Sequence, residues 1–294
     1  MIWLTGNKGM LGSDIEKLLI KTGVEFISSD REIDICSNSD VMNFLGGRKP
    51  DWIINAAAYT DVDRAEQEIE KAFNINAEGV KNIAETAGSL NAGLIHISTD
   101  YVFDGQNKSG YSEGDPVKPV NAYGESKLKG ELYLNDILAK HYIIRTSWLY
   151  GAYGKNFVLT ILDLLKQKNE IKIVSDQTGS PTYSCDLAEI VLSCITRDQG
   201  KYGIYNFSNS GSCSWYEFAC EIYRIGQSIG LVTSEVRLVP VTTSEFLRPA
   251  MRPAYSLLKK DKIKRELNVN VRGWKEALAA FMEVLRSKTN GETS

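Results

Sequence analysis

Short apolar runs alternate with longer amphipathic segments along the first half of the chain. The runs IWLT, DWIINAAA, GLIHIS and HYIIRTS are apolar almost throughout, whereas segments such as MLGSDIEKLLIK repeat apolar residues at helical spacing. Continuous apolar strands that alternate with helices are typical of a parallel sheet covered on both faces. The pattern therefore predicts an α/β fold built on a Rossmann-type, doubly wound parallel sheet.

The alternation loosens after about residue 150. NFVLTILDLLKQ, SCDLAEIVLSCI and SWYEFACEIYRIG have helical patterns, and the tail RGWKEALAAFMEVLRSK carries one apolar stripe that we expect to be core. We predict a first domain over residues 1–154, joined by about 170–208, and a smaller, mainly helical C-terminal lobe over 155–169 and 209–294. Ligands of such folds bind beyond the carboxyl ends of the strands, where the two parts meet.

Composition and charge exclude several classes of protein. The 294 residues carry a net charge of −3 without a long basic run, so we expect no nucleic-acid partner. No stretch of about 18 apolar residues is present, and the N-terminus lacks the pattern of a signal peptide. The five cysteines are scattered and lack a CxxC pair, which indicates a reduced, cytoplasmic protein. With only two histidines, a histidine-rich metal centre is excluded.

The segment TGNKGMLG follows the first predicted strand and opens the first predicted helix. Gly6 suits a tight turn, Gly9 allows the backbone to approach a pyrophosphate, and Gly12 allows the helix to pack closely on the sheet. The helix start at Met10 and Leu11 offers unpaired N–H groups to an anion. An ordinary strand–helix turn is the simpler reading, but this context favours a dinucleotide-binding domain and, by extension, a substrate-binding C-terminal lobe.

The end of the second strand, SSDREID, carries residues that would contact the adenosine half of the cofactor. Asp30 is placed to accept a hydrogen bond from the ribose 2′-hydroxyl of NADH, whereas Arg31 would pair with the 2′-phosphate of NADPH. Both cofactors remain candidates, and Arg31 favours NADPH or use of both. We expect Asp34 and Ile35 near the adenine, although a solvated turn explains them nearly as well.

A core strand ends in STDYVFDG, and a predicted helix begins at NAYGESK. Tyr123 and Lys127 share a helical face at i, i+4 spacing, which by itself would be an ordinary exposed pair. A free phenol has a pKa of about 10, and a neighbouring ammonium lowers it toward the working range. Next to a nicotinamide, these residues suit carbonyl reduction. Tyr123 would protonate the carbonyl oxygen, Thr99 would hydrogen-bond it, and Lys127 would also hold the nicotinamide ribose.

The order of glycine loop, strand-end threonine and Tyr-x-x-x-Lys resembles the short-chain dehydrogenase/reductase superfamily, in its extended, nucleotide-sugar branch. NAAAYTDVDRAE is similar to the family's Asn-Ala-Ala segment along the cofactor, which implies that Ala56, Ala57 and Tyr59 are cofactor neighbours. Dehydratases of this branch carry Thr-Asp-Glu, whereas this chain has tyrosine after Asp100. The missing glutamate argues against dehydration.

Five further motifs, STDYVFDG, VNAYGESK, RTSWLYG, DQTGSPT and RPAMRPAYSLL, resemble the dTDP-4-dehydrorhamnose reductase family, and the match runs to about residue 285. The resemblance implies reduction of the 4-keto group of dTDP-6-deoxy-L-lyxo-4-hexulose to dTDP-L-rhamnose, a polysaccharide precursor, with NADPH or NADH as donor. It also implies that Asp100, Tyr101 and Trp148 line the sugar pocket and that Arg252 faces the diphosphate. An indole suits a sugar's C–H face and a guanidinium suits phosphate.

Simpler roles for these residues stay open: a strand-end cap for Asp100, a core aromatic for Trp148 and a surface salt bridge for Arg252. The alternatives for the whole chain are a non-catalytic, NADP-binding regulatory subunit resembling the methionine adenosyltransferase beta subunit, and a reductase or epimerase of another nucleotide-sugar. The intact set of Thr99, Tyr123 and Lys127 argues against the regulatory subunit.

Some members of the resembled family dimerise through magnesium held by glutamates. The corresponding positions here are Asp14 and Cys185, and no C-terminal counterpart is visible. A thiol is a poor ligand for magnesium. We therefore expect no metal requirement, and a monomer or a homodimer rather than a metal-bridged dimer.

Overall fold

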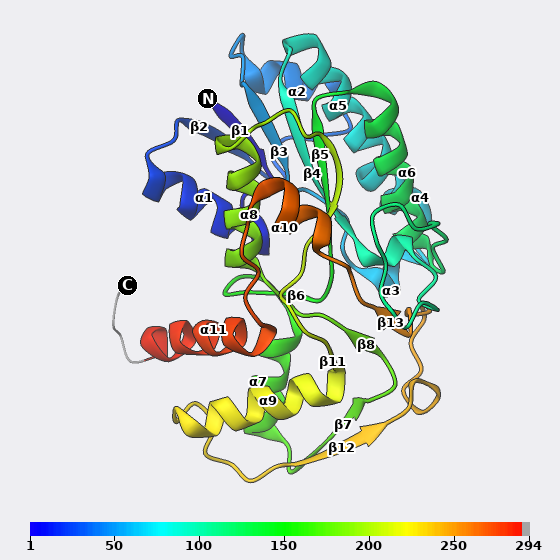
Figure 1. The fold of residues 1–294 in the computed structure, drawn as a ribbon, viewed down its shortest axis with the longest axis vertical. Helices are drawn as coiled ribbons and strands as arrows, with labels where there is room; N and C mark the ends of the chain where they lie inside the picture. Colours follow the sequence, from blue (N-terminus) through cyan, green and yellow to red (C-terminus); the bar gives the residue numbers. More distant parts are fainter. Residues whose placement is uncertain (290–294) are drawn as a thin grey trace.

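The computed structural model describes residues 1–289, and its central layer is a six-stranded parallel sheet (Figure 1). The strands lie in the order β10-β5-β4-β3-β1-β2, so the chain starts in the interior and winds outward in both directions. Their bounds are β1 (Ile2–Thr5), β2 (Phe26–Ser29), β3 (Trp52–Asn55), β4 (Gly93–Thr99), β5 (His141–Thr146) and β10 (Gly203–Asn206). The predicted doubly wound fold is confirmed.

Helices cover both faces of this sheet, and each face has its own hydrophobic core. One face packs against α1 (Met10–Thr22), α8 (Ser184–Thr196) and α10 (Asp261–Leu267). The other packs against α2 (Asn38–Leu45), α5 (Gly79–Leu90) and α6 (Ala122–Ile137). Because both faces are buried, the strands are apolar almost throughout, which explains their continuous hydrophobic runs in the sequence.

The helical region expected from about residue 66 to 90 is divided into separate pieces. After the short α3 (Val62–Ala65), α4 (Ile69–Phe73) leads through a π-helical turn (Asn74–Glu78) into α5. Within the turn, the buried Asn76 side chain accepts from the Tyr59 backbone N–H at 2.8 Å and donates to the Tyr59 carbonyl at 3.0 Å. Such π-turns occur frequently at functional sites, and this one fixes the loop that follows β3.

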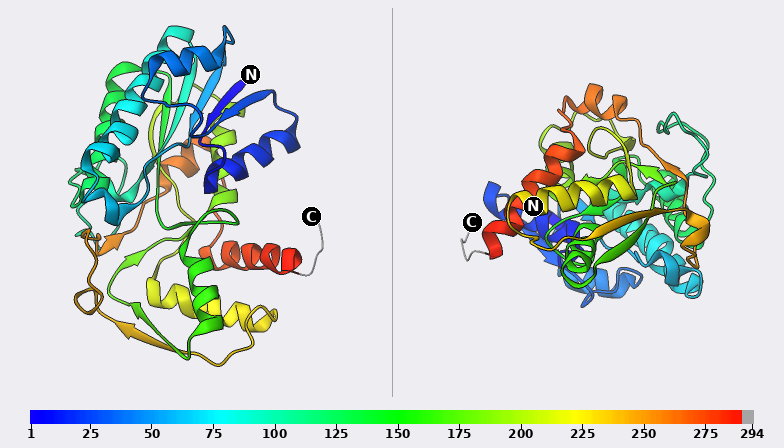
Figure 2. Two further views of the ribbon diagram at one scale, coloured as in Figure 1. Left: turned by 180° about the vertical axis from the view of Figure 1, so that it is seen from behind. Right: turned by 90° about the horizontal axis from the view of Figure 1, so that it is seen from below.

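The C-terminal lobe lies at one end of the sheet, beyond the carboxyl ends of the strands (Figures 1 and 2). It contains α7 (Phe157–Gln167), α9 (Trp215–Ser228) and α11 (Trp274–Thr289), which share a third core. Short strands complete it: β6 (Leu149–Tyr150), β7 (Glu170–Val174), β8 (Thr178–Gly179), β9 (Thr182–Tyr183), β11 (Cys213–Ser214), β12 (Arg237–Val241) and β13 (Tyr255–Ser256). The predicted apolar stripe of α11 packs into this core.

The cores divide the chain differently from the sequence-based boundaries: the lobe includes β6, β7, β8 and β9, all expected in the first domain, and it lacks α10. We expected β7 within the first domain, but it pairs in parallel with β12 and packs with the lobe. We expected α10 within the lobe, but Ile263 and Leu267 are buried in the sheet core beside α8. In both cases the deciding contact joins segments far apart in sequence, which local pattern does not reveal. Residues 290–294 of the expected lobe lie outside the described part.

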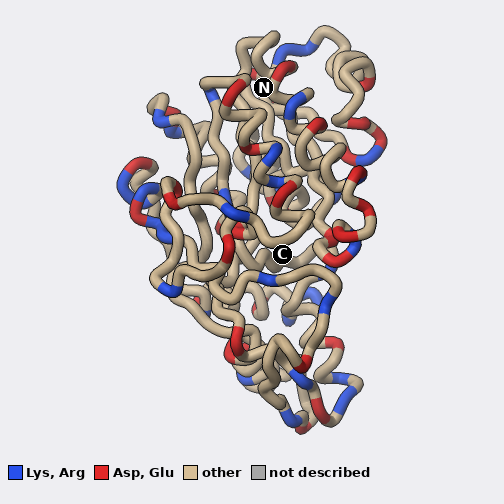
Figure 3. Tube along the Cα trace, turned by 90° about the vertical axis from the view of Figure 1, so that its right-hand side faces the viewer, with Lys and Arg blue, Asp and Glu red and all other residues tan. Residues whose placement is uncertain are grey.

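Charged residues of both signs are interspersed along the chain trace (Figure 3). Within residues 1–289, no helix combines the length and the apolar character needed to cross a membrane.

Candidate active site

The glycine loop joins β1 to α1 with a geometry that only glycine tolerates. Gly6 has φ +71°, and a Cβ there would lie 2.7 Å from the Ala57 nitrogen. A Cβ on Gly12 would collide with the Gly6 carbonyl oxygen. Gly9 is the N-cap of α1, which has neither a side-chain cap nor an acidic residue in its first turn. Free N–H groups and a close backbone approach fit the pyrophosphate of a dinucleotide.

The other residues predicted around the adenosine half differ in where their side chains lie. Leu11 is buried in the sheet core, so it would offer only backbone, whereas Met10 is half-buried at the helix start. Asp30 is half-buried at the end of β2, and its N–H donates to Glu32 Oε1 at 2.8 Å. Arg31 is exposed. A carboxylate and a guanidinium therefore stand together at the position that distinguishes NADH from NADPH.

Asp34 and Ile35 lie one turn further on and face different surroundings. Asp34 is exposed and accepts from the Cys36 N–H at 2.9 Å, which is the solvated-turn arrangement. Ile35 is 7% exposed and packs against α5, where a Cβ on Gly79 would lie 2.8 Å from its Cδ1. Its side chain therefore packs in the core.

The segment after β3 lies beside the glycine loop. Ala56 and Ala57 are half-buried there, and the Ala57 N–H donates to Asn55 Oδ1 at 3.2 Å. Tyr59 is buried, and its hydroxyl donates to Glu68 Oε2 at 3.1 Å. The alanines thus border the cradle with small side chains, while Tyr59 anchors the following loop.

Thr99 and Tyr123 meet where β4 ends and α6 begins. Asn121 caps α6 by accepting from the Gly124 N–H at 2.8 Å, which fixes the turn that carries Tyr123. Thr99 is 5% exposed, and its hydroxyl donates to Asp100 Oδ1 at 3.0 Å. The Thr99 side chain also hydrogen-bonds the Tyr123 phenol. The structure therefore brings the predicted threonine and tyrosine together.

The protonation of Tyr123 differs from the sequence-based expectation. Burial raises the pKa of its phenol to about 12, and the Asp100 carboxylate adds to this while the Thr99 hydrogen bond opposes it. The expected lowering by Lys127 is not seen, because Lys127 Nζ is turned to the sheet, where it donates to the Ile97 carbonyl at 2.6 Å and lies 3.1 Å from His96 Nε2. Burial lowers the pKa of Lys127 to about 8. A phenol with this pKa keeps its proton at neutral pH, as a proton donor must.

Asp100, Tyr101 and Arg252 form a second group beside Tyr123. The Tyr101 ring meets the Tyr123 ring edge to face, with centroids 5.5 Å apart, and its side chain hydrogen-bonds Arg252. Arg252 also forms an ion pair with Asp63 of α3. Asp100 is 3% exposed, and burial raises its pKa to about 6. Its Oδ2 has no hydrogen-bond partner within the described residues.

Trp148 occupies a strained position near the same group. Its φ is +47°, a conformation that costs about 1–2 kcal/mol for a residue with a side chain. One face of its indole stacks on Trp215, with centroids 3.5 Å apart and planes 10° apart, and its edge packs on Gly179 of β8. Strand β8 pairs with β13, whose Ser256 lies beside Asp100. Trp148 is half-buried, so its indole is neither fully enclosed in the core nor fully exposed to solvent.

Several polar residues at the site were not identified from the sequence. Asn76, Asn121 and His96 are buried, and each hydrogen-bonds a segment that carries a candidate site residue. Asp63 holds Arg252. A histidine inside the apolar run GLIHIS was a usable signal, since a buried polar residue needs a partner. The other three lie in helical or loop segments, where polar residues are ordinary.

Two positions that correspond to the family's metal ligands, Asp14 and Cys185, lie together. Asp14 hydrogen-bonds Ser184 and Cys185, and burial raises its pKa. Within residues 1–289, no group of three or more His, Cys, Asp or Glu side chains is placed to hold a metal ion.

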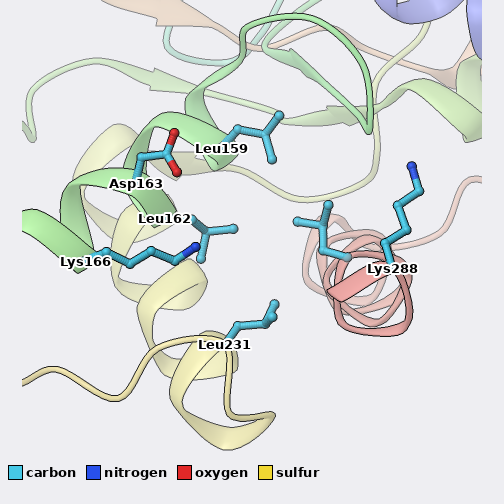
Figure 4. Close-up of a pocket in the computed structure, with 7 residues that line it drawn as sticks. Leu159, Leu162, Asp163, Lys166, Leu231 and Lys288 are labelled. Atoms are coloured by element: carbon cyan, nitrogen blue, oxygen red, sulfur yellow. The ribbon is translucent and has the colours of Figure 1, made fainter. Parts of the chain in front are cut away.

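A separate hollow lies in the lobe, away from these residues (Figure 4). Its volume is about 250 Å³, and its walls come from α7, α11 and the segment after α9. They are lined by Leu159, Leu162, Asp163, Lys166, Leu231, Leu285 and Lys288. None of the candidate catalytic or cofactor residues contributes to it, so we assign the chemistry to the strand ends instead.

The doubly wound sheet, the glycine cradle and the Thr–Tyr–Lys set define a dinucleotide-dependent enzyme of the short-chain dehydrogenase/reductase class. More specifically, the chain belongs to the RmlD substrate binding domain family, whose model matches residues 1–287. This confirms the family predicted from the sequence.

Individual relatives agree with this assignment. The chain is 39% identical over 281 residues to a dTDP-4-dehydrorhamnose reductase of Aggregatibacter actinomycetemcomitans, covering 94% of this chain and 96% of the relative. It is 41% identical over 283 residues to the spore coat polysaccharide biosynthesis protein SpsK of Bacillus subtilis, covering 96% of each. The structure of a Bacillus anthracis dTDP-4-dehydrorhamnose reductase in complex with NADP has a TM-score of 0.91 at 39% identity, covering 96% of this chain and 98% of that one.

Proposed function

We propose that this protein is an NADPH- or NADH-dependent reductase that converts dTDP-6-deoxy-L-lyxo-4-hexulose to dTDP-L-rhamnose. The observation that carries the proposal is the meeting of Thr99 and Tyr123 at the end of β4, with Lys127 one turn further along α6. The family assignment supports the substrate, since relatives of nearly equal length carry the name dTDP-4-dehydrorhamnose reductase.

The chain's own residues divide the work of a carbonyl reduction. When bound, the nicotinamide supplies a hydride to the C4 carbonyl carbon. Tyr123 holds a proton at its phenol oxygen at neutral pH and donates it to the carbonyl oxygen. Thr99, whose hydroxyl proton would turn from Asp100 Oδ1 to the same oxygen, would donate a hydrogen bond to it and orient it. When charged, Lys127 stabilises the phenolate that forms when Tyr123 gives up its proton.

The cofactor would lie along the carboxyl edge of β1, β2 and β3. Gly6, Gly9 and Gly12 would let the pyrophosphate approach the start of α1, where N–H groups are free. Asp30 and Arg31 would contact the adenosine ribose, and the exposed guanidinium favours NADPH while leaving NADH usable.

The sugar nucleotide would lie between β4 and the lobe. Asp100 and Tyr101 would contact the sugar from the side of β4, and the exposed part of Trp148 would cover its C–H face. Arg252 would bind the diphosphate with the guanidinium N–H groups that Asp63 leaves free.

The setting of the reaction is also a proposal. All five cysteines are free thiols, which supports a reducing compartment, and we place the enzyme in the cytoplasm as a monomer or homodimer.

The direct test is oxidation of NADPH and NADH by the purified protein, followed by the loss of nicotinamide absorbance. The substrate would be dTDP-4-keto-6-deoxyglucose with the 3,5-epimerase present. We expect turnover that Tyr123→Phe lowers roughly a hundredfold or more, with cofactor affinity retained. Tight dinucleotide binding without turnover would instead favour another nucleotide-sugar or the regulatory-subunit alternative.

A further inference from the structure

A line of buried side chains runs beneath the site from β1 to α6. Thr5 Oγ1 donates to Asn55 Oδ1 at 2.8 Å, and Asn55 Nδ2 lies 3.3 Å from His96 Nδ1. On the far side of the imidazole, His96 Nε2 lies 3.1 Å from Lys127 Nζ. The exposed fractions are 1% for Thr5, 0% for Asn55 and His96, and 2% for Lys127. Donors and acceptors along a line this deeply buried have to match.

The amide of Asn55 sets the direction of the line. The Ala57 backbone N–H, which can only donate, bonds Asn55 Oδ1 at 3.2 Å. The amide oxygen is therefore committed to Ala57 and Thr5, and the amide nitrogen faces His96. Because Nδ2 can only donate, His96 Nδ1 accepts, and a neutral imidazole then carries its proton on Nε2. Burial lowers the pKa of His96 well below its usual value, which keeps the ring neutral.

This tautomer directs an N–H group at Lys127. An ammonium group has three donors and no acceptor, whereas a neutral amine has one lone pair that can accept. Lys127 Nζ already donates to the Ile97 carbonyl at 2.6 Å. The contacts of Lys127 Nζ with His96 and with the Ile97 carbonyl are both matched when Lys127 is neutral. A charged Lys127 would need the His96 proton on Nδ1, where it would oppose the Asn55 N–H.

We propose that His96 is a positioning residue of the reductase: its Nε2–H holds the Lys127 amine in place and opposes its charging, and Asn55 selects the tautomer that does so. The inference rests on the proposed function for its effect on turnover, but the tautomer itself is independent of any substrate.

Other titratable groups around Lys127 and His96 also shift the pKa values of these two residues, some upward and some downward. Glu131 of α6 raises the pKa of Lys127, although Arg145 of β5 forms an ion pair with that carboxylate. Burial outweighs Glu131 and lowers the pKa of Lys127 to about 8. On the other side, His141 of β5 and Lys127 itself add to the lowering of the His96 pKa. Turnover should therefore fall as the pH rises past about 8, where Lys127 loses the charge that stabilises the Tyr123 phenolate.

The tautomer can be measured directly, because the chain has only two histidines. Nitrogen NMR of protein labelled with ¹⁵N-histidine should show His96 neutral from about pH 6 to 9, with its proton on Nε2 once Lys127 is neutral, above about pH 8. His141→Gln leaves one imidazole and so assigns the signals. Asn55→Asp presents a carboxylate to Nδ1 and should move the proton there. A proton on Nδ1 in the unmodified protein at about pH 9, or an imidazolium at about pH 6, would overturn the proposal.

The effect on turnover has its own test. His96→Gln can turn its side-chain oxygen toward Lys127 and accept from the ammonium, so the alkaline limb of kcat should move up by about one pH unit. His141→Gln, the matched histidine variant, should leave the limb unchanged. An unmoved limb in a folded His96→Gln protein would contradict the positioning role. Absence of turnover in the unmodified protein would instead refute the proposed function, and the NMR result would still decide the tautomer.

Discussion

Thr99 and Lys127 are 5% and 2% exposed, whereas the Arg252 side chain is 21% exposed and Trp148 is half-buried. The first two, with Tyr123, form the proposed catalytic side of the site, and they sit on a sheet strand and a capped helix. Trp148 and Arg252, with residues 242–254, form the proposed substrate side. One side is held by backbone and core packing, and the other by a few side-chain contacts.

The attachments of the substrate side illustrate the difference. Asp63 pairs with Arg252 and accepts from the Ala250 N–H at 3.2 Å, and Asn121 donates to the Met251 carbonyl at 2.7 Å. Earlier in residues 242–254, before these contacts, Leu247 is 86% exposed. Partly exposed ion pairs contribute little to stability, so such a segment can change its sequence and conformation at small cost. If the proposed roles hold, the chemistry is fixed by the fold while substrate choice is left to an adaptable surface.

The largest effect is expected from breaking the buried support of the catalytic side. Glu131 and Arg145 are 2% and 3% exposed, and Ser98 also donates to Glu131. Glu131→Gln leaves the Arg145 charge buried without a counter-ion, so the free energy of unfolding should fall by about 3–5 kcal/mol. Urea denaturation measures it, with Glu283→Gln at an exposed ion pair as the control. A loss in the free energy of unfolding below about 1 kcal/mol would show that α6 does not depend on the Glu131–Arg145 ion pair.

A smaller change in the free energy of unfolding, an increase rather than a loss, is expected when the Asp100 carboxylate is replaced. Asp100 is a proposed substrate contact, but its burial lowers stability at neutral pH. Its pKa is raised from 3.8 to about 6 by burial, so the folded state holds the proton more tightly than the unfolded state does. Stability is therefore lost as the pH rises from about 4 to 6. Asp100→Asn removes this cost and should raise the free energy of unfolding at pH 7 by about 2–3 kcal/mol, with little change at about pH 4. Denaturation curves at both pH values, together with kcat, measure the effect; a pH-independent difference would contradict the assigned cause.

The same division separates what the sequence could and could not predict. On the catalytic side, apolar strands, glycines and the Tyr-x-x-x-Lys spacing are local patterns, and the structure places Thr99 beside Tyr123 as they imply. The expected lowering of the Tyr123 pKa failed, because it depends on where a flexible lysine side chain ends. Lys127 bonds His96 and the Ile97 carbonyl, and that contact between strand and helix has no signature in the spacing.

On the substrate side, prediction from sequence reached residue identities but not their arrangement. Trp148 and Arg252 come from matching motifs, yet their partners Trp215 and Asp63 lie far away in the chain. The lobe boundary fails for the same reason at β7 and α10, which belong to cores assembled from distant segments. Long-range pairing is decided by the packing of whole elements, and a local hydrophobic pattern is compatible with more than one such arrangement.

The smallest effect on stability is expected at Asp63, and it tests the substrate side directly. Asp63→Ala removes the partner of Arg252 and the acceptor of the Ala250 N–H, but both residues are partly exposed to water. The free energy of unfolding should fall by no more than about 1 kcal/mol. The Michaelis constant for the dTDP-sugar should nevertheless rise severalfold, because Arg252 is no longer held, while kcat stays close to that of the unmodified protein. Steady-state kinetics beside Glu283→Ala, which breaks a comparable pair on α11, separates this effect from loss of an exposed charge. If kcat fell instead and the Michaelis constant stayed unchanged, Asp63 would belong to the catalytic side, and the division between a fixed side and an adaptable one would not hold.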